Sequence, residues 1–244
     1  SDALQKLVRN FADHQVGYVT GKMVYAQADG SLVGDGCSAY MKYENWMREH
    51  ETQLGSIVGV DGGIDAMRKA LYETLNADQL PDFVQPLKVV EKGFRVIYDE
   101  DALLKEEALD DQGREYKMRV RVSLRALWAL HDMRQLLNPL KFGLFAWQMI
   151  SHKVMRYLAF IPILLCFVLN LALFNSAILY LLTLIIQVIF YSLAVLGKIN
   201  EGDKKAAVYF TLPYYFALLN IACAHATFRY LRGEKLVIWK PRGG

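Results

Sequence analysis

The sequence of 244 residues contains little cysteine, and its positive and negative charges nearly cancel. Its three cysteines, Cys37, Cys166 and Cys223, are odd in number and far apart, which excludes a disulfide framework and a clustered cysteine zinc site. A formal net charge of +3 is too small to indicate a nucleic-acid partner. With 54% apolar and 22% charged residues, the chain is neither disordered nor collagen-like. A folded protein of one or two domains remains.

The longest absence is that of ionisable side chains. From Tyr157 to Gly197, 41 consecutive residues include no Asp, Glu, Lys, Arg or His. One membrane pass takes about 20 apolar residues, and a charge at its centre costs about 2.5–3.5 kcal/mol. The stretch therefore predicts two transmembrane helices, at about 157–174 and 177–197, joined by a tight turn at Asn175-Ser176. The alternative is a set of buried helices in a large soluble core.

A third pass is predicted at about 206–231, where the only ionisable residue before Arg229 is His225. Residues 1–20 carry too many charges for a signal peptide. Lysine and arginine mark the cytoplasmic side of a membrane protein, and they flank the first two passes at Lys153, Arg156, Lys198, Lys204 and Lys205. The half before Tyr157 is therefore expected in the cytoplasm. Three passes that start inside end outside, yet the tail at 233–244 is also basic, so the side of the C-terminus stays open.

The segment before the first pass is predicted to be an interfacial helix. Asn138-Pro139 is a typical helix start, with Asn at the cap and Pro at the first helical position. Apolar residues then dominate 140–150, and His152, Lys153 and Arg156 follow. This pattern indicates an amphipathic helix in the headgroup region over 135–156, and an ordinary domain helix is the alternative.

The first 134 residues alternate between strand and helix patterns, which indicates an α/β architecture. Met41, Trp46, Met47 and Leu54 are placed on one face of the predicted helix at 38–54, and Asp29-Gly30 is a turn signal. About three strands are too few for a closed α/β domain, so the chain is expected to be the second half of something larger. Strands are predicted at 16–25, 57–60 and 94–98, and helices at 2–11, 38–54, 64–75 and 82–91.

Two features in this region could carry chemistry. Asp61-Gly62-Gly63 follows an expected strand, and glycines there allow a ligand close to the backbone; a plain tight turn is the alternative. Asp82, at a helix start, could act as a general base on an attacking hydroxyl, although Asp is also favoured there for capping alone.

A third feature is the basic stretch that ends at Trp128. Arg121 and Arg125 share one helical face, with Trp128 three residues further along. Arginine forks suit a diphosphate, and the indole offers a flat face for a sugar or base; a solvated basic helix beside a membrane is the alternative. Glu44 and Arg48 on the helix at 38–54 are interpreted as a solvated face. No metal cluster, P-loop or Ser-His-Asp arrangement is visible.

Four segments in order resemble the C-terminal part of a membrane-bound family 2 glycosyltransferase, the family of cellulose, poly-N-acetylglucosamine and hyaluronan synthases. The resemblance covers nearly the whole chain. The segments are YENWMREHETQLGSIVGVDGGIDAMRKALY at 43–72, LPDFVQPLKVVEKGFRVIYDEDALLKEE at 80–107, KMRVRVSLRALW at 117–128 and RYLRGEKLVIWKPR at 229–242.

The resemblance implies a GT-A catalytic domain at the cytoplasmic face, with Asp82 as the base. It implies that Asp61, Gly62, Gly63 and Trp128 bind the acceptor. The diphosphate would meet Arg121 or Arg125, because the family carries Gln-x-x-Arg-Trp there. This sequence has no such Gln, and two residues separate Arg125 from Trp128, which leaves the choice of arginine open. The Mg²⁺ or Mn²⁺ that the family uses would have its ligands upstream of residue 1, and no metal ligand is assigned in this chain.

The combined expectation is an inverting glycosyltransferase that moves a sugar from a UDP-sugar to a growing polysaccharide. It would sit in the inner (cell) membrane, in contact with lipids, and another polypeptide could supply the missing N-terminal half. Two alternatives stay open: a non-processive enzyme that glycosylates a lipid-linked acceptor, and a non-catalytic membrane subunit of a polysaccharide synthase. The expected organisation is part of a GT-A domain at 1–134, the interfacial helix at 135–156, transmembrane helices at 157–232 and a basic tail at 233–244.

Overall fold

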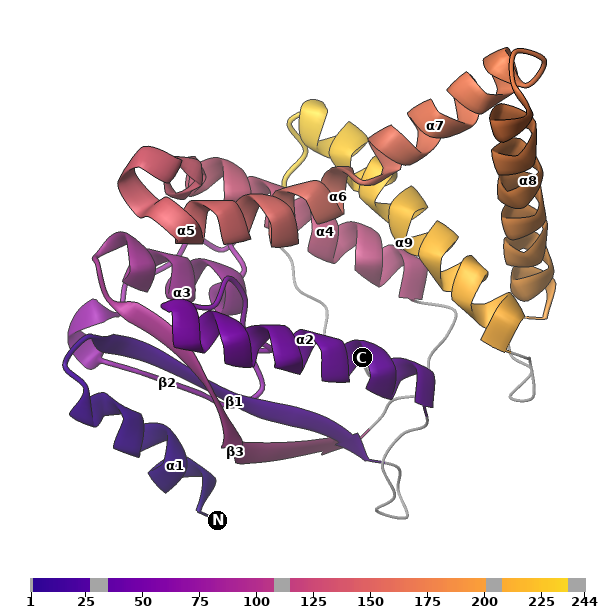
Figure 1. Ribbon diagram of the computed structural model, residues 1–244. Coiled ribbons are helices and arrows are strands. Elements are labelled where there is room, and N and C mark those ends of the chain that lie inside the picture. Colours follow the sequence, from indigo (N-terminus) through magenta and orange to yellow (C-terminus); the bar gives the residue numbers. More distant parts are fainter. Residues whose placement is uncertain (1, 27–34, 108–114, 201–207, 237–244) are drawn as a thin grey trace. The chain divides into compact units, whose positions relative to one another are not determined.

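The computed structural model describes residues 2–26, 35–107, 115–200 and 208–236 (Figure 1). At 25–26, 35–40 and 106–107 only the backbone is described. The predicted turn at Asp29-Gly30, the side chain of Cys37, the lysines at 204 and 205, and the tail beyond residue 236 therefore lie outside the described part.

The chain divides into two compact units. The first unit comprises Ser1–Asp110, Trp128–Lys153 and Leu236–Gly244, and the second comprises Asp111–Leu127 and Val154–Lys235. The boundary crosses helix α4 (Glu115–Asp132), whose first part belongs to the second unit and whose last turns belong to the first.

The first unit is built on a three-stranded sheet with the order β2-β1-β3. Strand β1 (Val16–Ala26) runs parallel to β3 (Arg95–Glu107) and antiparallel to β2 (Asp65–Met67). The predicted strands at 16–25 and 94–98 are thus confirmed, and both are longer than expected. The register of β1 with β3 shifts beside Gly21, where a Cβ atom would lie 2.3 Å from the carbonyl oxygen of Ala102. Only glycine allows β3 to approach this closely.

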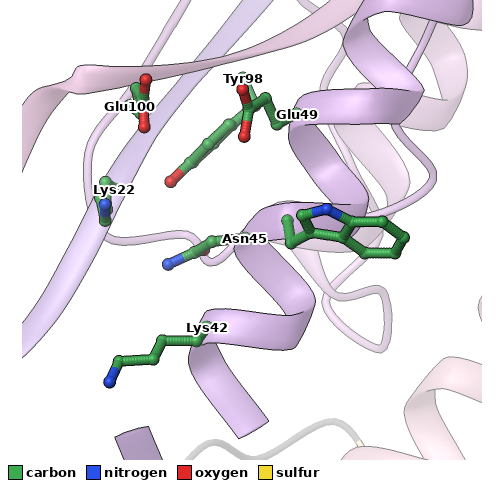
Figure 2. A pocket seen from close by; sticks show the side chains of 7 residues that line it. Lys22, Lys42, Asn45, Glu49, Tyr98 and Glu100 are labelled. Carbon is green, nitrogen blue, oxygen red and sulfur yellow. The ribbon is translucent and has the colours of Figure 1, made fainter. Parts of the chain in front are cut away.

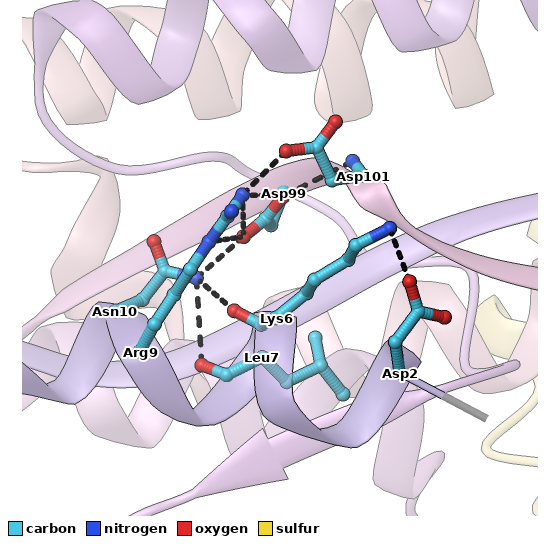
Figure 3. Close-up of polar contacts among 7 residues, drawn as sticks. All are labelled: Asp2, Lys6, Leu7, Arg9, Asn10, Asp99 and Asp101. Carbon is cyan, nitrogen blue, oxygen red and sulfur yellow. Dashed lines mark hydrogen bonds and ion pairs between the residues drawn. The ribbon is translucent and has the colours of Figure 1, made fainter.

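Successive residues of β3 face opposite sides of the sheet, as the strand period requires. Tyr98 and Glu100 lie beside helix α2 (Asp35–Leu54), as Figure 2 shows. Asp99 faces helix α1 (Ala3–Arg9), where it accepts hydrogen bonds from Arg9 (3.0–3.2 Å) and Asn10 (2.6 Å) (Figure 3). Helices α1 and α2 therefore cover opposite faces of the sheet. Beneath α1, a core cluster is formed by Leu7, Val16, Val19, Ile97 and Ala102.

Two predictions in the first unit were wrong. The expected helix at 64–75 is β2 followed by a 3-10 turn at Lys69–Leu71, because pairing with β1 fixes residues 65–67 as a strand. The expected strand at 57–60 is an extended segment outside the sheet. Ile57 donates to the Val96 carbonyl (2.9 Å), but Val58 donates to the carboxylate of Glu51 (3.2 Å), so a side chain replaces the next ladder partner.

The predicted helix at 38–54 is confirmed as α2, but its buried face is not the one expected. Trp46 and Leu54 are exposed. The buried positions are Glu44, Arg48 and Glu51, which follow the helical spacing i, i+4, i+7. The interpretation of Glu44 and Arg48 as a solvated face was wrong, because both charged groups have partners inside the first unit.

The remaining helices of the first unit agree more closely with the sequence. Helix α3 (Pro81–Glu91) confirms the prediction at 82–91. Helix α5 (Pro139–Met149) begins as predicted, with the Asn138 side chain accepting from the backbone N–H of Leu140 (3.0 Å). Leu140, Leu144 and Trp147 are exposed along α5, while Phe145 and Met149 are buried. The 3-10 turn Arg134–Leu137 precedes α5, and a π-helical segment, Ile150–Val154, follows it.

The second unit consists of helices whose buried positions are mostly small. The sharp turn at 174–176 is present where it was predicted. At Gly197 a Cβ atom would lie 2.3 Å from the carbonyl oxygen of Phe210, so α8 and α9 cross closely. Asn170 of α7 donates to Gln187 of α8 (3.0 Å). Besides the first part of α4, the described helices of this unit are α6 (Met155–Leu158), α7 (Phe160–Leu173), α8 (Ile178–Ile199) and α9 (Val208–Leu231).

Among the described residues, one helix, α8, is long and apolar enough to cross a membrane. The helical segments Pro139–Leu158 and Phe160–Leu173 meet the same criterion only together, and they are bent by 55° at the break. Helix α9 is longer, with 24 residues, but less apolar, because Asn220 and His225 interrupt it. His225 is hydrogen-bonded to the Tyr116 hydroxyl of α4 (3.0 Å). The first and third predicted passes therefore remain predictions.

Candidate functional site

Asp82 lies in the first turn of α3 and is exposed. The residue at the cap position is Leu80, whose side chain makes no capping hydrogen bond, and Pro81 occupies the first helical position. Gly62 packs directly against Asp82: a Cβ atom on Gly62 would lie 2.8 Å from the Asp82 Cβ and 3.2 Å from its Oδ2. Gly62 also has a φ of +73°, which favours glycine. Two features that are 20 positions apart in the sequence thus form one surface.

Behind this surface lies a group of buried polar side chains from β1 and β2. Burial raises the pKa of the Asp65 carboxyl, and the negative charges of Asp82 and Asp61 add to this effect, while the nearby Thr20 and Tyr18 hydroxyls oppose it. Burial beside Asp65 likewise raises the pKa of the Tyr18 phenol. Within the described residues, the Thr20 hydroxyl and Asp65 Oδ1 are buried without a hydrogen-bond partner. Asp82 thus lies within electrostatic range of a second carboxyl that resists ionisation.

Asp61 is fixed by a buried ion pair. The Arg48 guanidinium donates through both terminal nitrogens to the Asp61 carboxylate (2.6 and 2.5 Å), and both side chains are about 9% exposed. Arg48 also donates to the Gly59 carbonyl (3.3 Å) and to the Asn45 side chain (2.9 Å), and Glu44 is 3.9 Å away. A bidentate pair of this kind is both strong and directional. It holds the loop that carries Gly62 against α2.

The π-helical segment at 150–154 supplies two further side chains to the same loop. His152 Nδ1 lies 2.5 Å from the buried carboxylate of Glu51. The Lys153 ammonium lies 5.4 Å from the centre of the Phe83 ring, and a Cβ atom on Gly59 would be 2.3 Å from it. π-helical segments often occur at functional sites. Both side chains thus contact the first unit, and the interfacial position expected for 135–156 stays a prediction.

The other predicted site residues are not all shown to lie near Asp82 and Gly62. Gly63 follows Gly62, and a Cβ atom there would lie 3.0 Å from Leu104. Trp128 belongs to the first unit and packs edge-on against His131. Arg121 is half-buried and Arg125 buried, and both belong to the second unit. The structure therefore unites Asp61, Gly62, Gly63 and Asp82, and their relation to the two arginines stays a prediction.

The described residues do not fit a divalent metal. Across 2–24, 41–105, 115–200 and 208–236, where side chains are described, no group of three His, Cys, Asp or Glu side chains could hold one. Asp61 is committed to Arg48, and burial raises the pKa of the Asp65 carboxyl, which disfavours the charged form that a metal ligand needs.

Several residues of this surface were not predicted from the sequence. Arg48 and Glu51 could have been found, because they recur with Glu44 at i, i+4, i+7 on a helix whose other faces are also polar. Asp65 carried no such signal, since its position was assigned to a helix. His152 contacts Glu51, which is 101 positions away in the sequence, and no local sequence pattern can predict a contact at that separation.

No protein-family model matches the sequence, and no curated protein matches it. Among solved structures, the fold is similar to that of the mannosyltransferase PcManGT from Pyrobaculum calidifontis, solved in complex with GDP-Man and Mn²⁺, with a TM-score of 0.58 and 15% sequence identity. The similarity covers 96% of this chain and 59% of that chain, so this chain spans less than two thirds of the mannosyltransferase. At this identity, the similarity shows a shared glycosyltransferase fold and no more.

Proposed function

We propose that this chain provides the acceptor side of a membrane-integrated, inverting glycosyltransferase of family 2 that transfers a sugar from a UDP-sugar to a growing polysaccharide. One observation carries the proposal: an exposed carboxylate at a helix start, Asp82, packs against the positive-φ glycine Gly62. Glycines leave the backbone open to a ring-shaped ligand at the point where a base could reach one of its hydroxyls. The shared glycosyltransferase fold supports the same function.

In the proposed reaction, the acceptor lies over Gly62 and Gly63 with one hydroxyl hydrogen-bonded to Asp82. The hydroxyl oxygen attacks the anomeric carbon of the donor from the face opposite the diphosphate, and its proton passes to the Asp82 carboxylate. The bond between the anomeric carbon and the diphosphate oxygen breaks, and its electron pair leaves with UDP. The configuration at the anomeric carbon is therefore inverted. The ion pair between Arg48 and Asp61 keeps the glycine loop in place throughout.

The departing diphosphate needs positive charge, which Arg121 or Arg125 of α4 would supply through bidentate hydrogen bonds. Trp128, further along α4, would offer its face to the acceptor. A divalent ion in such enzymes neutralises charge on the leaving diphosphate, but the described residues do not fit one. No step of the proposal depends on a metal held by this chain.

The second unit supports the membrane context of the proposal. Ile186 on α8 and Leu164 on α7 are more than 60% exposed, whereas Ala222 and Ala226 on α9 are buried. Small residues at helix contacts with large apolar residues outside are typical of helices in lipid. In the first unit, the exposed side chains of Leu140, Leu144 and Trp147 would place α5 in the headgroup region.

The test uses membranes that contain the complete protein, with radiolabelled UDP-glucose, UDP-N-acetylglucosamine and GDP-mannose in parallel. We expect one UDP-sugar to label a product whose length grows with time on gel filtration. Label of fixed size that extracts into chloroform and methanol would instead identify a lipid-carrier transferase. No incorporation from any donor by this protein alone, with incorporation only after a partner synthase is added, would identify a non-catalytic subunit and contradict the proposal.

A further inference from the structure

A hollow of about 160 Å³ opens between α2 and strands β1 and β3 of the first unit. It has room for several water molecules and so for one small ring, but not for a nucleotide. It is distinct from the surface between Gly62 and Asp82, because none of the four predicted acceptor residues lines it. The lining residues are Lys22, Lys42, Asn45, Trp46, Glu49, Tyr98 and Glu100.

Tyr98 shows that this hollow is suited to a polar ligand. The residue is only 7% exposed, and its hydroxyl has no hydrogen-bond partner among the described residues. Figure 2 shows its ring reaching into the hollow between Lys22, Glu100 and Asn45. A buried hydroxyl normally has a partner, so the missing partner is best supplied by a ligand that enters the hollow.

The remaining side chains determine the chemistry of that ligand. Two ammonium groups, Lys22 and Lys42, donate, and two carboxylates, Glu49 and Glu100, accept. A phosphate would be repelled by the carboxylates, and within the described residues no acidic group forms a metal site. A neutral polyol uses both kinds of group at once, because each of its hydroxyls donates and accepts.

The surroundings of the hollow favour a sugar over other polyols. Along α2, the exposed rings of Tyr43 and Trp46 are stacked with centroids 6.2 Å apart, and Trp46, which lines the hollow, is tilted against His50 at 4.5 Å. Flat aromatic faces can cover the C–H face of a pyranose. Asn45, in the lining, accepts a hydrogen bond from Arg48, which binds Asp61 of the glycine loop. The hollow is thus linked to the candidate acceptor site through one side chain.

We propose that this hollow is a second saccharide subsite, which binds one neutral pyranose ring of the acceptor further along the chain than the ring that reacts. Its role as an acceptor subsite rests on the proposed function, whereas its affinity for a sugar does not. The Tyr98 hydroxyl donates a hydrogen bond to one hydroxyl of the sugar ring or accepts one from it. The lysines and glutamates surround the other hydroxyls of the ring. Binding here would hold the growing saccharide while the next sugar is added.

The test is saturation-transfer NMR on the full chain in detergent, with methyl β-D-glucopyranoside, methyl α-D-mannopyranoside and methyl N-acetyl-β-D-glucosaminide as probes. We expect at least one glycoside to bind with a Kd of a few millimolar. Tyr98→Phe removes only the hydroxyl, and it should weaken binding about five- to tenfold without lowering the melting temperature. Gln53→Ala, at an exposed position on α2 outside the hollow, should bind like the natural chain.

Two results would overturn the subsite: no saturation transfer to any glycoside, or equal binding by the natural chain and Tyr98→Phe. Asp82→Asn separates this failure from failure of the proposed function. That variant should lose transfer yet keep its affinity for the glycoside. In the transfer assay, Tyr98→Phe should raise the acceptor KM more than it lowers kcat. A drop in kcat alone would contradict a role in holding the acceptor.

Discussion

The two units of this chain bury opposite kinds of residue. In the first unit, α3 buries Val84, Leu87 and Val89 against the sheet, and the charges inside are paired, as Arg48 and Asp61 are. In the second unit the buried positions include Gly197 and Ala222, while α7 and α8 expose large apolar side chains along their length. This is the difference expected if the second unit is the group of lipid-facing helices that we propose.

This difference shows where each unit obtains its stability. The first unit gains it from removing apolar surface from water and from satisfying a few buried charges. The second unit, if surrounded by lipid, gains it from close helix contacts and from polar pairs such as Asn170 with Gln187. Substitutions at buried positions should therefore destabilise the two units for different reasons, namely an unpaired charge in the first unit and an overpacked helix contact in the second.

The largest expected effect on stability comes from Arg48→Met in the first unit. The substitution leaves the Asp61 carboxylate buried without its partner, which should lower the free energy of unfolding by about 3–5 kcal/mol. Thermal unfolding of the chain in detergent, followed by near-ultraviolet circular dichroism, measures this.

Arg134→Met removes an exposed arginine of the same unit and should change stability by less than about 0.5 kcal/mol. Arg48→Met with Asp61→Asn should lose less than Arg48→Met alone, because no buried charge remains unpaired. If Arg48→Met unfolds at the temperature of the natural chain, the buried pair does not hold the loop.

A smaller effect is expected in the second unit from Gly197→Val. The added side chain would meet the Phe210 backbone and should destabilise the contact of α8 with α9 by about 1–3 kcal/mol. Ile186→Ala removes more apolar surface but at an outward position, 64% exposed, so it should have almost no effect in detergent. Unfolding by increasing concentrations of sodium dodecyl sulfate measures the stability of both variants. A larger loss for Ile186→Ala would mean that α8 is the core helix of a soluble fold.

Features with a local signal were predicted well. Val16–Tyr25 is rich in β-branched and aromatic residues and forms β1. Pro81 starts α3 and Gly93, with φ +83°, follows its end. The cap at Asn138 and the turn at 174–176 depend on a few adjacent residues, which is why the sequence sufficed.

Features that depend on distant partners were not predicted. Asp65–Met67 has no strand pattern of its own and becomes β2 only because Tyr18–Thr20 offers a pairing edge. The buried face of α2 was misplaced because Arg48 obtains its partner 13 positions away. The sequence does not single out Tyr98, because one tyrosine in a strand is ordinary. Only the structure shows that its hydroxyl is buried and has no hydrogen-bond partner among the described residues.

For the candidate site, the sequence named the residues but could not test their roles. Asp82 and Gly62 carry separate signals in the sequence, and the structure places them in contact. The positions of Arg121 and Arg125 relative to Asp82 stay a prediction, because they belong to the other unit.

The most direct measurement is the initial rate of sugar transfer by Asp82→Asn in membranes that contain the complete protein. Its matched control is Glu91→Gln, which changes an exposed carboxylate at the far end of the same helix. Loss of a general base should reduce kcat about 10²- to 10⁴-fold with little change in donor KM, while Glu91→Gln stays at the natural rate. Transfer by Asp82→Asn at the rate of the control would contradict the account, because no proton would then need to reach this carboxylate.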